Sequence, residues 1–174
     1  MKNHFKVSVL GASGRMGSQI IKRVNESPNI DLHCVVEHKG HNWIGQDCGE
    51  KLLGRENNII VTDDLNLALS SADAVIDFST PDNSLECLKI CTHTNTAHII
   101  GTTGFDSSQE SKIDGYAEKV VVVKAGNMSL GINILTSLVE KISSSLDSDF
   151  DTEILEVHHR NKVDAPSGTA LMLG

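Results

Sequence analysis

A short apolar run followed at once by three closely spaced glycines constrains the fold of this chain more than any other feature. Residues 5–10 alternate and are rich in valine, so we expect a buried strand there. Gly11, Gly14 and Gly17 come next and open a segment with apolar residues at helical spacing. Such a strand–turn–helix is typical of dinucleotide-binding folds, where the glycines permit a tight turn, close approach of a pyrophosphate and close helix packing. The alternative interpretation is an ordinary tight turn.

Glu37 favours the dinucleotide interpretation. It follows a second predicted strand, residues 32–36, and lies 20 residues after Gly17. An acidic side chain at that strand end is placed to accept hydrogen bonds from the adenosine ribose hydroxyls. His38 and Lys39 come next and could meet a 2′-phosphate, which favours tolerance of NADPH as well as NADH. The alternative is that both belong to a solvated loop.

The composition argues against two kinds of partner. The formal net charge of −8 disfavours nucleic acid, because phosphate binding needs a basic face. No apolar run approaches the ~20 residues of a membrane helix, so we expect a cytoplasmic protein with no membrane partner.

The cysteines lack Cys-x-x-Cys spacing, so we expect buried thiols in a reducing compartment and no metal site. They are Cys34, Cys48, Cys87 and Cys91.

Strands and helices alternate from residue 5 to about residue 127. Further strands are predicted at 59–62, 74–79, 98–100 and 120–123, and helices at 65–70 (capped by Asp63 or Asp64), 81–94 and 107–119. The valine run at 120–123 does not alternate, which predicts a strand buried on both faces. Residues 39–58, rich in glycine, are predicted to be a loop insertion. The pattern indicates an α/β fold, a doubly wound parallel Rossmann sheet.

Ligands of such sheets bind beyond the carboxyl ends of the strands. Five segments of this chain are predicted to lie at those ends and to converge on one crevice. They are the glycine loop, Glu37, residues 79–81, residues 101–103 and residues 125–128.

After a dinucleotide-binding domain of residues 1–128, residues 129–174 are predicted to begin a substrate-binding domain of α+β type. A helix is expected at 129–145 and a strand within 150–158. The sequence stops a few residues into another predicted helix, and compact domains rarely end so early in an element. We therefore expect the second domain to be truncated.

Residues 156–170, with the sequence Glu-Val-His-His-Arg-Asn-Lys-Val-Asp-Ala-Pro-Ser-Gly-Thr-Ala, concentrate groups that suit an anionic substrate. Four of them bind or protonate anions and fall within five positions: His158, His159, Arg160 and Lys162. A Pro-Ser-Gly-Thr turn then leads into a predicted helix start, whose free backbone N–H groups could hold a carboxylate. The alternative is structural, with one histidine in the core and Arg160 paired with Glu156 or Asp164.

Taken in order, the whole chain resembles the dihydrodipicolinate reductase family of the bacterial diaminopimelate and lysine pathway. The resemblance rests on the glycine loop, on residues 76–81, 100–105 and 125–131, and above all on residues 156–170. It implies NAD(P)H-dependent reduction of 4-hydroxy-tetrahydrodipicolinate to tetrahydrodipicolinate, with a homotetramer in the full-length protein. The family often has Arg where His38 stands, which leaves the choice between NADH and NADPH open. Its members also continue well beyond residue 174.

The resemblance also implies roles for individual residues. His158 and Lys162 would be the acid/base pair. The substrate carboxylates would be held by His159, Lys162, Gly168 and Thr169. The nucleotide would be bound by Gly11, Ala12, Ser13, Gly14, Arg15 and Met16, by Glu37, by Gly101, Thr102 and Thr103, and by Ala125, Gly126, Asn127 and Met128.

The chemistry of these residue types fits the reaction independently of the resemblance. Hydride transfer to an unsaturated, imine-containing ring develops negative charge that must be protonated, and histidine titrates near neutral pH. A lysine supplies a point cation with three donors. Two alternatives are a related semialdehyde dehydrogenase and a catalytically silent nucleotide-binding domain. The histidine–lysine segment disfavours the silent domain, which would need only residues 1–128.

Overall fold

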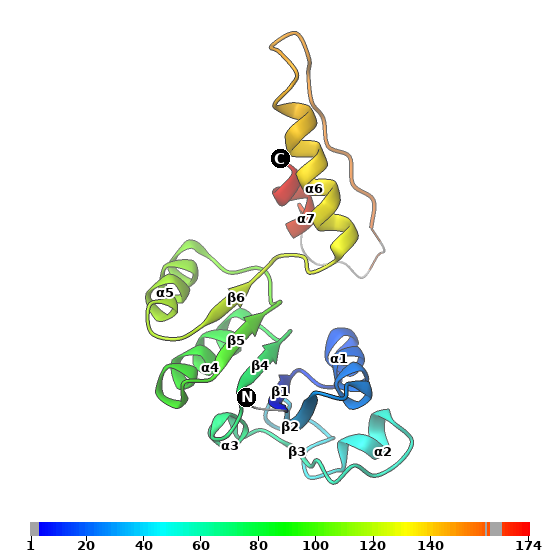
Figure 1. The fold of residues 1–174 in the computed structure, drawn as a ribbon, viewed down its shortest axis with the longest axis vertical. Coiled ribbons are helices and arrows are strands. Elements are labelled where there is room, and N and C mark those ends of the chain that lie inside the picture. Colours follow the sequence, from blue (N-terminus) through cyan, green and yellow to red (C-terminus); the bar gives the residue numbers. More distant parts are fainter. Residues whose placement is uncertain (1–3, 159, 161–164) are drawn as a thin grey trace. The chain divides into compact units, whose positions relative to one another are not determined.

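The computed structural model describes residues 4–158, 160 and 165–174, and the chain forms two compact units, Met1–Lys124 and Ala125–Gly174. A six-stranded parallel sheet of order β3-β2-β1-β4-β5-β6 runs through the first unit (Figure 1). Its strands are β1 (Phe5–Leu10), β2 (Ile30–Val36), β3 (Val61–Thr62), β4 (Ala74–Asp77), β5 (Ala97–Ile100) and β6 (Val122–Lys124). This order confirms the predicted doubly wound α/β sheet.

The helices of the first unit cover the sheet from both faces. They are α1 (Arg15–Glu26), α2 (Cys48–Leu52), α3 (Leu65–Leu69), α4 (Pro81–Thr94) and α5 (Ser107–Ala117). Helices α3, α4 and α5 contribute to an apolar cluster that includes Leu10 and Val75, whereas α1 and α2 contribute to a second cluster that includes Val9 and Val35. The neighbours Val9 and Leu10 fall in different clusters because successive side chains of a strand point to opposite faces.

Local signals fix where several helices begin and end. The side chain of Asp64 accepts two backbone N–H bonds and caps α3, which selects it over the neighbouring Asp63. Pro81 occupies the first turn of α4, where its missing N–H costs nothing, and Asn95 ends this helix with a φ of 57°. A capping box formed by Asp106 and Gln109 begins α5.

Two predictions for the first unit were wrong. Residues 39–58 are not all loop, because the Asp47 side chain caps α2 and Asp47 also forms an isolated bridge with Ile60. The last strand starts at Val122 and is not buried on both faces, since Val121 and Val123 are 66% and 53% exposed. Strand β6 lies at the edge of the sheet, and the cluster around α1 and α2 does not extend to it.

The second unit contains α6 (Leu130–Ser143) and α7 (Gly168–Leu173), and the side chains of Ser129 and Ser167 cap them. The strand predicted within residues 150–158 does not form among these described residues. A strand needs a partner for its backbone N–H and C=O groups, and the described part of this unit supplies no other strand.

Candidate functional site

The glycine loop between β1 and α1 has the close backbone contacts that only glycine allows. Gly11 has a φ of 71°, in the left-handed region. A Cβ atom on Gly17 would lie 2.0 Å from the carbonyl oxygen of Gly11, so any other residue would push the first turn of α1 away from the loop. Gly14, the residue before α1, has no side chain with which to cap the helix.

The N-termini of α1 and α4 are available to an anion. Among the described helices, these two have no side-chain hydrogen bond at their N-cap, whereas the side chains of Asp or Ser cap the other five. Both helices begin at a cavity of about 290 Å³ whose lining includes Gly11, Gly14, Ser79 and Thr80. A positive helix end with unused N–H groups binds phosphate well, so this cavity fits the pyrophosphate of a dinucleotide.

Glu37 lines the same cavity from the end of β2 and is only 6% exposed. Its Oε1 atom accepts a hydrogen bond from the Ser13 backbone N–H at 2.6 Å, and its Oε2 atom accepts one from the His38 N–H at 3.3 Å. These bonds hold the carboxylate beside the glycine loop. An adenosine ribose entering here would meet an acceptor for its hydroxyl groups.

A second cavity, of about 490 Å³, also opens at the end of β2. Two side chains of its lining are basic, His38 and Lys39. Four are acidic: Glu37, Asp63, Asp64 and Glu86. Nearby carboxylates repel a phosphate, while the Lys39 ammonium attracts one and the His38 ring can donate a hydrogen bond to it. The lining therefore disfavours a 2′-phosphate without excluding it.

Beneath the same sheet edge, four polar side chains form a unit that we call the Asp77 network: Asp77, Ser79, His98 and Thr102. The Oδ2 atom of Asp77 lies 3.1 Å from Nε2 of His98, and both side chains are fully buried. Its Oδ1 atom accepts bonds from the Ser79 N–H at 2.9 Å and from the Thr102 hydroxyl at 3.3 Å. Burial raises the pKa of Asp77, but the hydrogen bonds from His98 and Ser79 and the charge of His98 outweigh burial and hold this pKa below its ordinary value.

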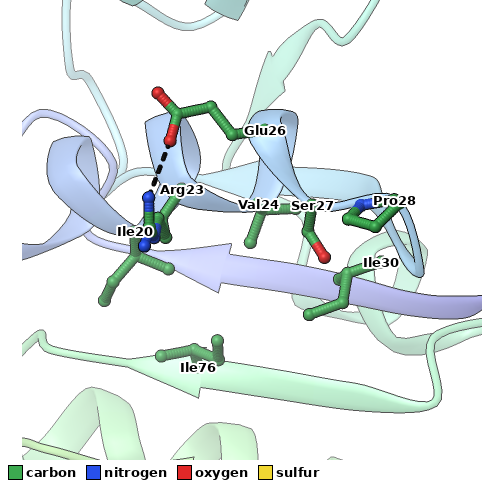
Figure 2. A pocket seen from close by; sticks show the side chains of 8 residues that line it. All are labelled: Ile20, Arg23, Val24, Glu26, Ser27, Pro28, Ile30 and Ile76. Atoms are coloured by element: carbon green, nitrogen blue, oxygen red, sulfur yellow. Dashed lines mark hydrogen bonds and ion pairs between the residues drawn. The ribbon is translucent and has the colours of Figure 1, made fainter.

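A larger cavity, of about 580 Å³, lies elsewhere in the first unit, between α1 and the sheet (Figure 2). Its walls are mainly apolar and include Ile20, Ile30 and Ile76. Its two charged side chains, Arg23 and Glu26, bind each other at 3.0 Å. Size alone does not make it the functional site, because the glycine loop and Glu37 line the other cavities.

In the second unit, Glu156 connects the histidine segment to α7. Its Oε2 atom lies 3.4 Å from Nδ1 of His158, and its Oε1 atom accepts the Ser167 backbone N–H at 2.8 Å. The Asn127 side-chain amide donates to the Thr169 hydroxyl at 3.0 Å. A predicted nucleotide-binding residue, Asn127, thus contacts a predicted substrate-binding residue, Thr169, within this unit.

Comparisons with known proteins agree with this geometry. Residues 5–128 match the model of the dihydrodipicolinate reductase N-terminus, and residues 131–174 match the model of its C-terminus. The chain belongs to the dihydrodipicolinate reductase family. Both parts of the family are therefore represented in it.

Individual relatives are longer than this chain. The 4-hydroxy-tetrahydrodipicolinate reductase of Ruegeria sp. (strain TM1040) is 47% identical over 97% of this chain and 62% of its own length. The dipicolinate-bound dihydrodipicolinate reductase from Paenisporosarcina sp. TG-14 is 26% identical with a TM-score of 0.73, over 98% of this chain and 65% of that one. The chain thus spans less than two thirds of these members of the family. An aspartate semialdehyde dehydrogenase with NADP from Candida albicans, 16% identical over 79% of this chain and 47% of that one with a TM-score of 0.55, shares the fold alone.

In this member of the dihydrodipicolinate reductase family, the predicted nucleotide residues of the first unit lie at the carboxyl edge of the sheet. They are Gly11, Ala12, Ser13, Gly14, Arg15 and Met16, Glu37, and Gly101, Thr102 and Thr103. Phe78 lies against both Gly11 of the glycine loop and Gly101 of the turn after β5. Its carbonyl oxygen would meet a Cβ of Gly11 at 3.1 Å, and its ring would meet a Cβ of Gly101 at 2.2 Å.

The remaining predicted residues belong to the second unit or fall outside the description. Ala125, Gly126, Asn127, Met128, His158, Gly168 and Thr169 lie in the second unit. His159 and Lys162 lie outside the described residues. Their expected roles stay predictions.

Asp77 and His98 are polar residues that the sequence analysis did not assign to the site. Asp77 could have been noticed, because it ends a buried strand directly before a Ser-Thr-Pro turn. His98 carries no such signal, since histidine is found about as readily at the surface as in the interior. Only the pairing of β4 with β5 brings His98 to Asp77.

The four cysteines are free and buried, as predicted. The Sγ atoms of Cys87 and Cys91 lie 4.0 Å apart, and His98 is close enough to complete a set of metal-binding residue types. The hydrogen bond with Cys91, together with burial, strongly raises the pKa of Cys87, so without a metal ion this thiol stays protonated. We therefore assign these thiols to core packing.

Within the described residues, no helix combines the length and apolarity needed to cross a membrane.

Proposed function

We propose that this chain carries the coenzyme-binding and acid-catalytic parts of a 4-hydroxy-tetrahydrodipicolinate reductase. The reaction removes water from the hydroxylated ring and adds a hydride and a proton, which gives tetrahydrodipicolinate. The match of residues 131–174 to the family's C-terminal model carries the proposal. That match covers the histidine–lysine segment, which a plain nucleotide-binding domain does not need.

The first unit binds NADH or NADPH, which supplies the hydride. The N-termini of α1 and α4 hold the pyrophosphate, and Glu37 accepts hydrogen bonds from the adenosine ribose. The lining of the two cavities at the end of β2 supports this assignment, because it combines unused backbone donors with a buried carboxylate. The turns that contain Ser79 and Thr102 complete the site from the neighbouring strands.

The second unit supplies the proton and holds the dicarboxylate. His158 donates the proton to the reduced ring, and Glu156 orients its imidazole through Nδ1, so that Nε2 faces the reaction. Lys162 and His159 bind one substrate carboxylate by charge, while Gly168 and Thr169 bind the other. Dipicolinate in the Paenisporosarcina enzyme is a cyclic dicarboxylate, which supports this class of substrate.

Further parts of the proposal concern the whole protein. We assign residues 1–128 to the nucleotide-binding domain and residues 129–174 to the beginning of the substrate-binding domain. The complete protein acts in the cytoplasm as a homotetramer. Family membership supports these assignments.

Calorimetric titration with NADH, NADPH and pyridine-2,6-dicarboxylate tests the proposal, followed by an assay of coenzyme oxidation with substrate generated in situ. We expect one coenzyme site per chain and dicarboxylate binding that Lys162→Ala weakens. Glu37→Ala is the matched variant for the coenzyme site. Binding of NADH without dicarboxylate binding or turnover would instead indicate a silent nucleotide-binding domain. No binding of either coenzyme would overturn the proposal entirely.

A further inference from the structure

Asp77 and His98 form a fully buried pair of titratable groups in the first unit that the proposed reaction does not use. Both side chains have no exposed surface, and their facing atoms, Oδ2 and Nε2, are 3.1 Å apart. Among the described residues, the other ring nitrogen of His98, Nδ1, has no hydrogen-bond partner. The hydrogen bonding of this ring is therefore directed at Asp77.

The second oxygen of Asp77 connects two turns. Oδ1 accepts the backbone N–H of Ser79, in the turn after β4, and the hydroxyl of Thr102, in the turn after β5. The Ser79 hydroxyl also donates to Oδ1, at 2.5 Å, and the Ser79 N–H lies 3.0 Å from the Thr102 hydroxyl oxygen. One carboxylate thus sets the spacing between the two turns.

Both turns belong to the proposed coenzyme site. Ser79 and Thr80 line the 290 Å³ cavity beside the glycine loop, and Asn83 in the first turn of α4 donates to the Ser79 hydroxyl at 3.0 Å. Thr102 lies between Gly101 and Thr103, which are predicted nucleotide residues. His98 does not contribute to the lining of this cavity, and its hydrogen bond to Asp77 connects it to the two turns.

We propose that His98 is a positioning residue for coenzyme binding, because it anchors Oδ2 of Asp77 so that Oδ1 can hold the Ser79 and Thr102 turns together. Without a donor at Oδ2, the buried carboxylate turns toward other donors, and the two turns separate. The inference rests on the proposed coenzyme site. It assigns the binding strength of that site in part to a residue that never touches the coenzyme.

The test compares two substitutions of His98 in the 174-residue chain. His98→Leu has a similar volume and no donor, whereas His98→Gln places an amide N–H near the position of Nε2. Hydrogen exchange of the Ser79 amide is measured without coenzyme, and the NADH dissociation constant is measured by calorimetry. For His98→Leu we expect exchange at Ser79 to accelerate and the dissociation constant to rise about tenfold, whereas His98→Gln should stay within about threefold of the wild-type value.

Thr96→Val is the matched control. It should lower the stability of the fold without changing the Asp77 network. Thr96 directly precedes β5, is fully buried, and donates to the carbonyl oxygens of Leu69 and Ala72 at 3.1 and 3.3 Å. This substitution should destabilise the fold and leave both the Ser79 exchange and the NADH affinity unchanged. An equal loss of affinity in Thr96→Val and His98→Leu would reduce His98 to a purely structural role and overturn the proposal.

A double-mutant cycle keeps the proposal testable if His98→Leu does not fold. Asp77→Asn and His98→Met, which removes the donor with a flexible apolar side chain, are combined, and their effects on NADH affinity must be non-additive because both act through one carboxylate. Additive effects would overturn the inference. A wild-type chain that does not bind NADH would overturn the proposed function instead, while the Ser79 exchange would still decide whether His98 orders the turn.

Discussion

The carboxylate of Glu37 accepts the backbone N–H of Ser13 at 2.6 Å, which joins the end of β2 to the glycine loop. Two parts of the dinucleotide fingerprint, 24 residues apart, are therefore already in contact without a ligand. A coenzyme that binds here meets an acceptor whose position is fixed in advance. Such preorganisation lowers the ordering cost of binding.

Replacing Glu37 should weaken coenzyme binding selectively. We expect Glu37→Ala to weaken NADH binding by about 1–3 kcal/mol, because hydrogen bonds between the ribose hydroxyls and a charged group are lost. Calorimetry measures the change. Asp31→Ala is the control, because Asp31 lies near the other end of β2 and is 55% exposed at its side chain. Unchanged NADH affinity in a folded Glu37→Ala protein would refute the ribose assignment.

Both coenzymes should bind, with NADH preferred. The carboxylates of Asp63, Asp64 and Glu86 repel a 2′-phosphate, whereas His38 and Lys39 partly neutralise it. We expect the two dissociation constants to differ by less than a thousandfold, or about 4 kcal/mol. Lys39→Ala should weaken NADPH and leave NADH unchanged in parallel titrations. A larger difference in either direction would contradict this prediction.

Two glycine-to-alanine substitutions should have opposite effects on stability. Gly17→Ala places a Cβ 2.0 Å from the Gly11 carbonyl oxygen and should cost about 1–3 kcal/mol or more. Gly115→Ala, on the open face of α5, meets nothing within 4 Å and should stabilise the protein by up to about 1 kcal/mol. Urea unfolding measures both. A neutral Gly17→Ala would mean that α1 can move away from the loop.

The stability contributed by Asp77 should depend on pH. Because the pKa of Asp77 is lower in the folded state than the ordinary value of 3.8, its ionisation stabilises the fold fully above about pH 4, and this contribution is lost as the pH falls through the folded-state pKa. At pH 6, Asp77→Asn should cost about 3–5 kcal/mol, because it breaks a buried pair. The difference in unfolding free energy between variant and wild type should shrink below pH 4 in urea titrations. A difference that stays constant from pH 6 to pH 2.5 would contradict the low pKa.

In the full-length enzyme, we expect catalysis to divide between His158 and Lys162. His158→Gln should lower turnover by about a hundredfold or more and leave coenzyme binding intact, as expected for a lost general acid. Lys162→Ala should lower turnover and also raise the substrate Michaelis constant, because it removes a charge contact that exists before the transition state. Initial rates of NADH oxidation, with dipicolinate affinity as a second measurement, test both variants. Near-normal turnover in both would return the histidine segment to a structural role.

The sequence predicted those parts of the fold whose signals are local. Alternating valines, the glycine spacing, the cap at Asp64 and the proline that begins α4 each act within a few residues, so β1, α1, α3 and α4 could be recognised. The strand expected within residues 150–158 failed because pairing depends on a distant partner. The predicted burial of Val121 and Val123 was wrong for a similar reason, because the burial of an apolar residue depends on which other elements cover it.

In the candidate site, too, the residues with local signals could be predicted and those that depend on tertiary contacts could not. Glu37 could be assigned from its distance to Gly17, because that spacing reflects one strand–helix–strand unit. The contribution of His98 could not, because it depends on the register between β4 and β5 and on one hydrogen bond across that pair. The acidic side chains near His38 include Asp63, Asp64 and Glu86, which come from two further segments of the chain.

The pairing of Asp77 with His98 also restricts how this sequence can change over generations. Loss of His98 alone leaves a buried carboxylate without its partner, whereas replacing both residues by well-packed apolar ones can be almost neutral. Drift at these two positions, 21 residues apart, is therefore not independent. Whichever of the two residues changes first, a lineage that abandons the pair must pass through a less stable intermediate.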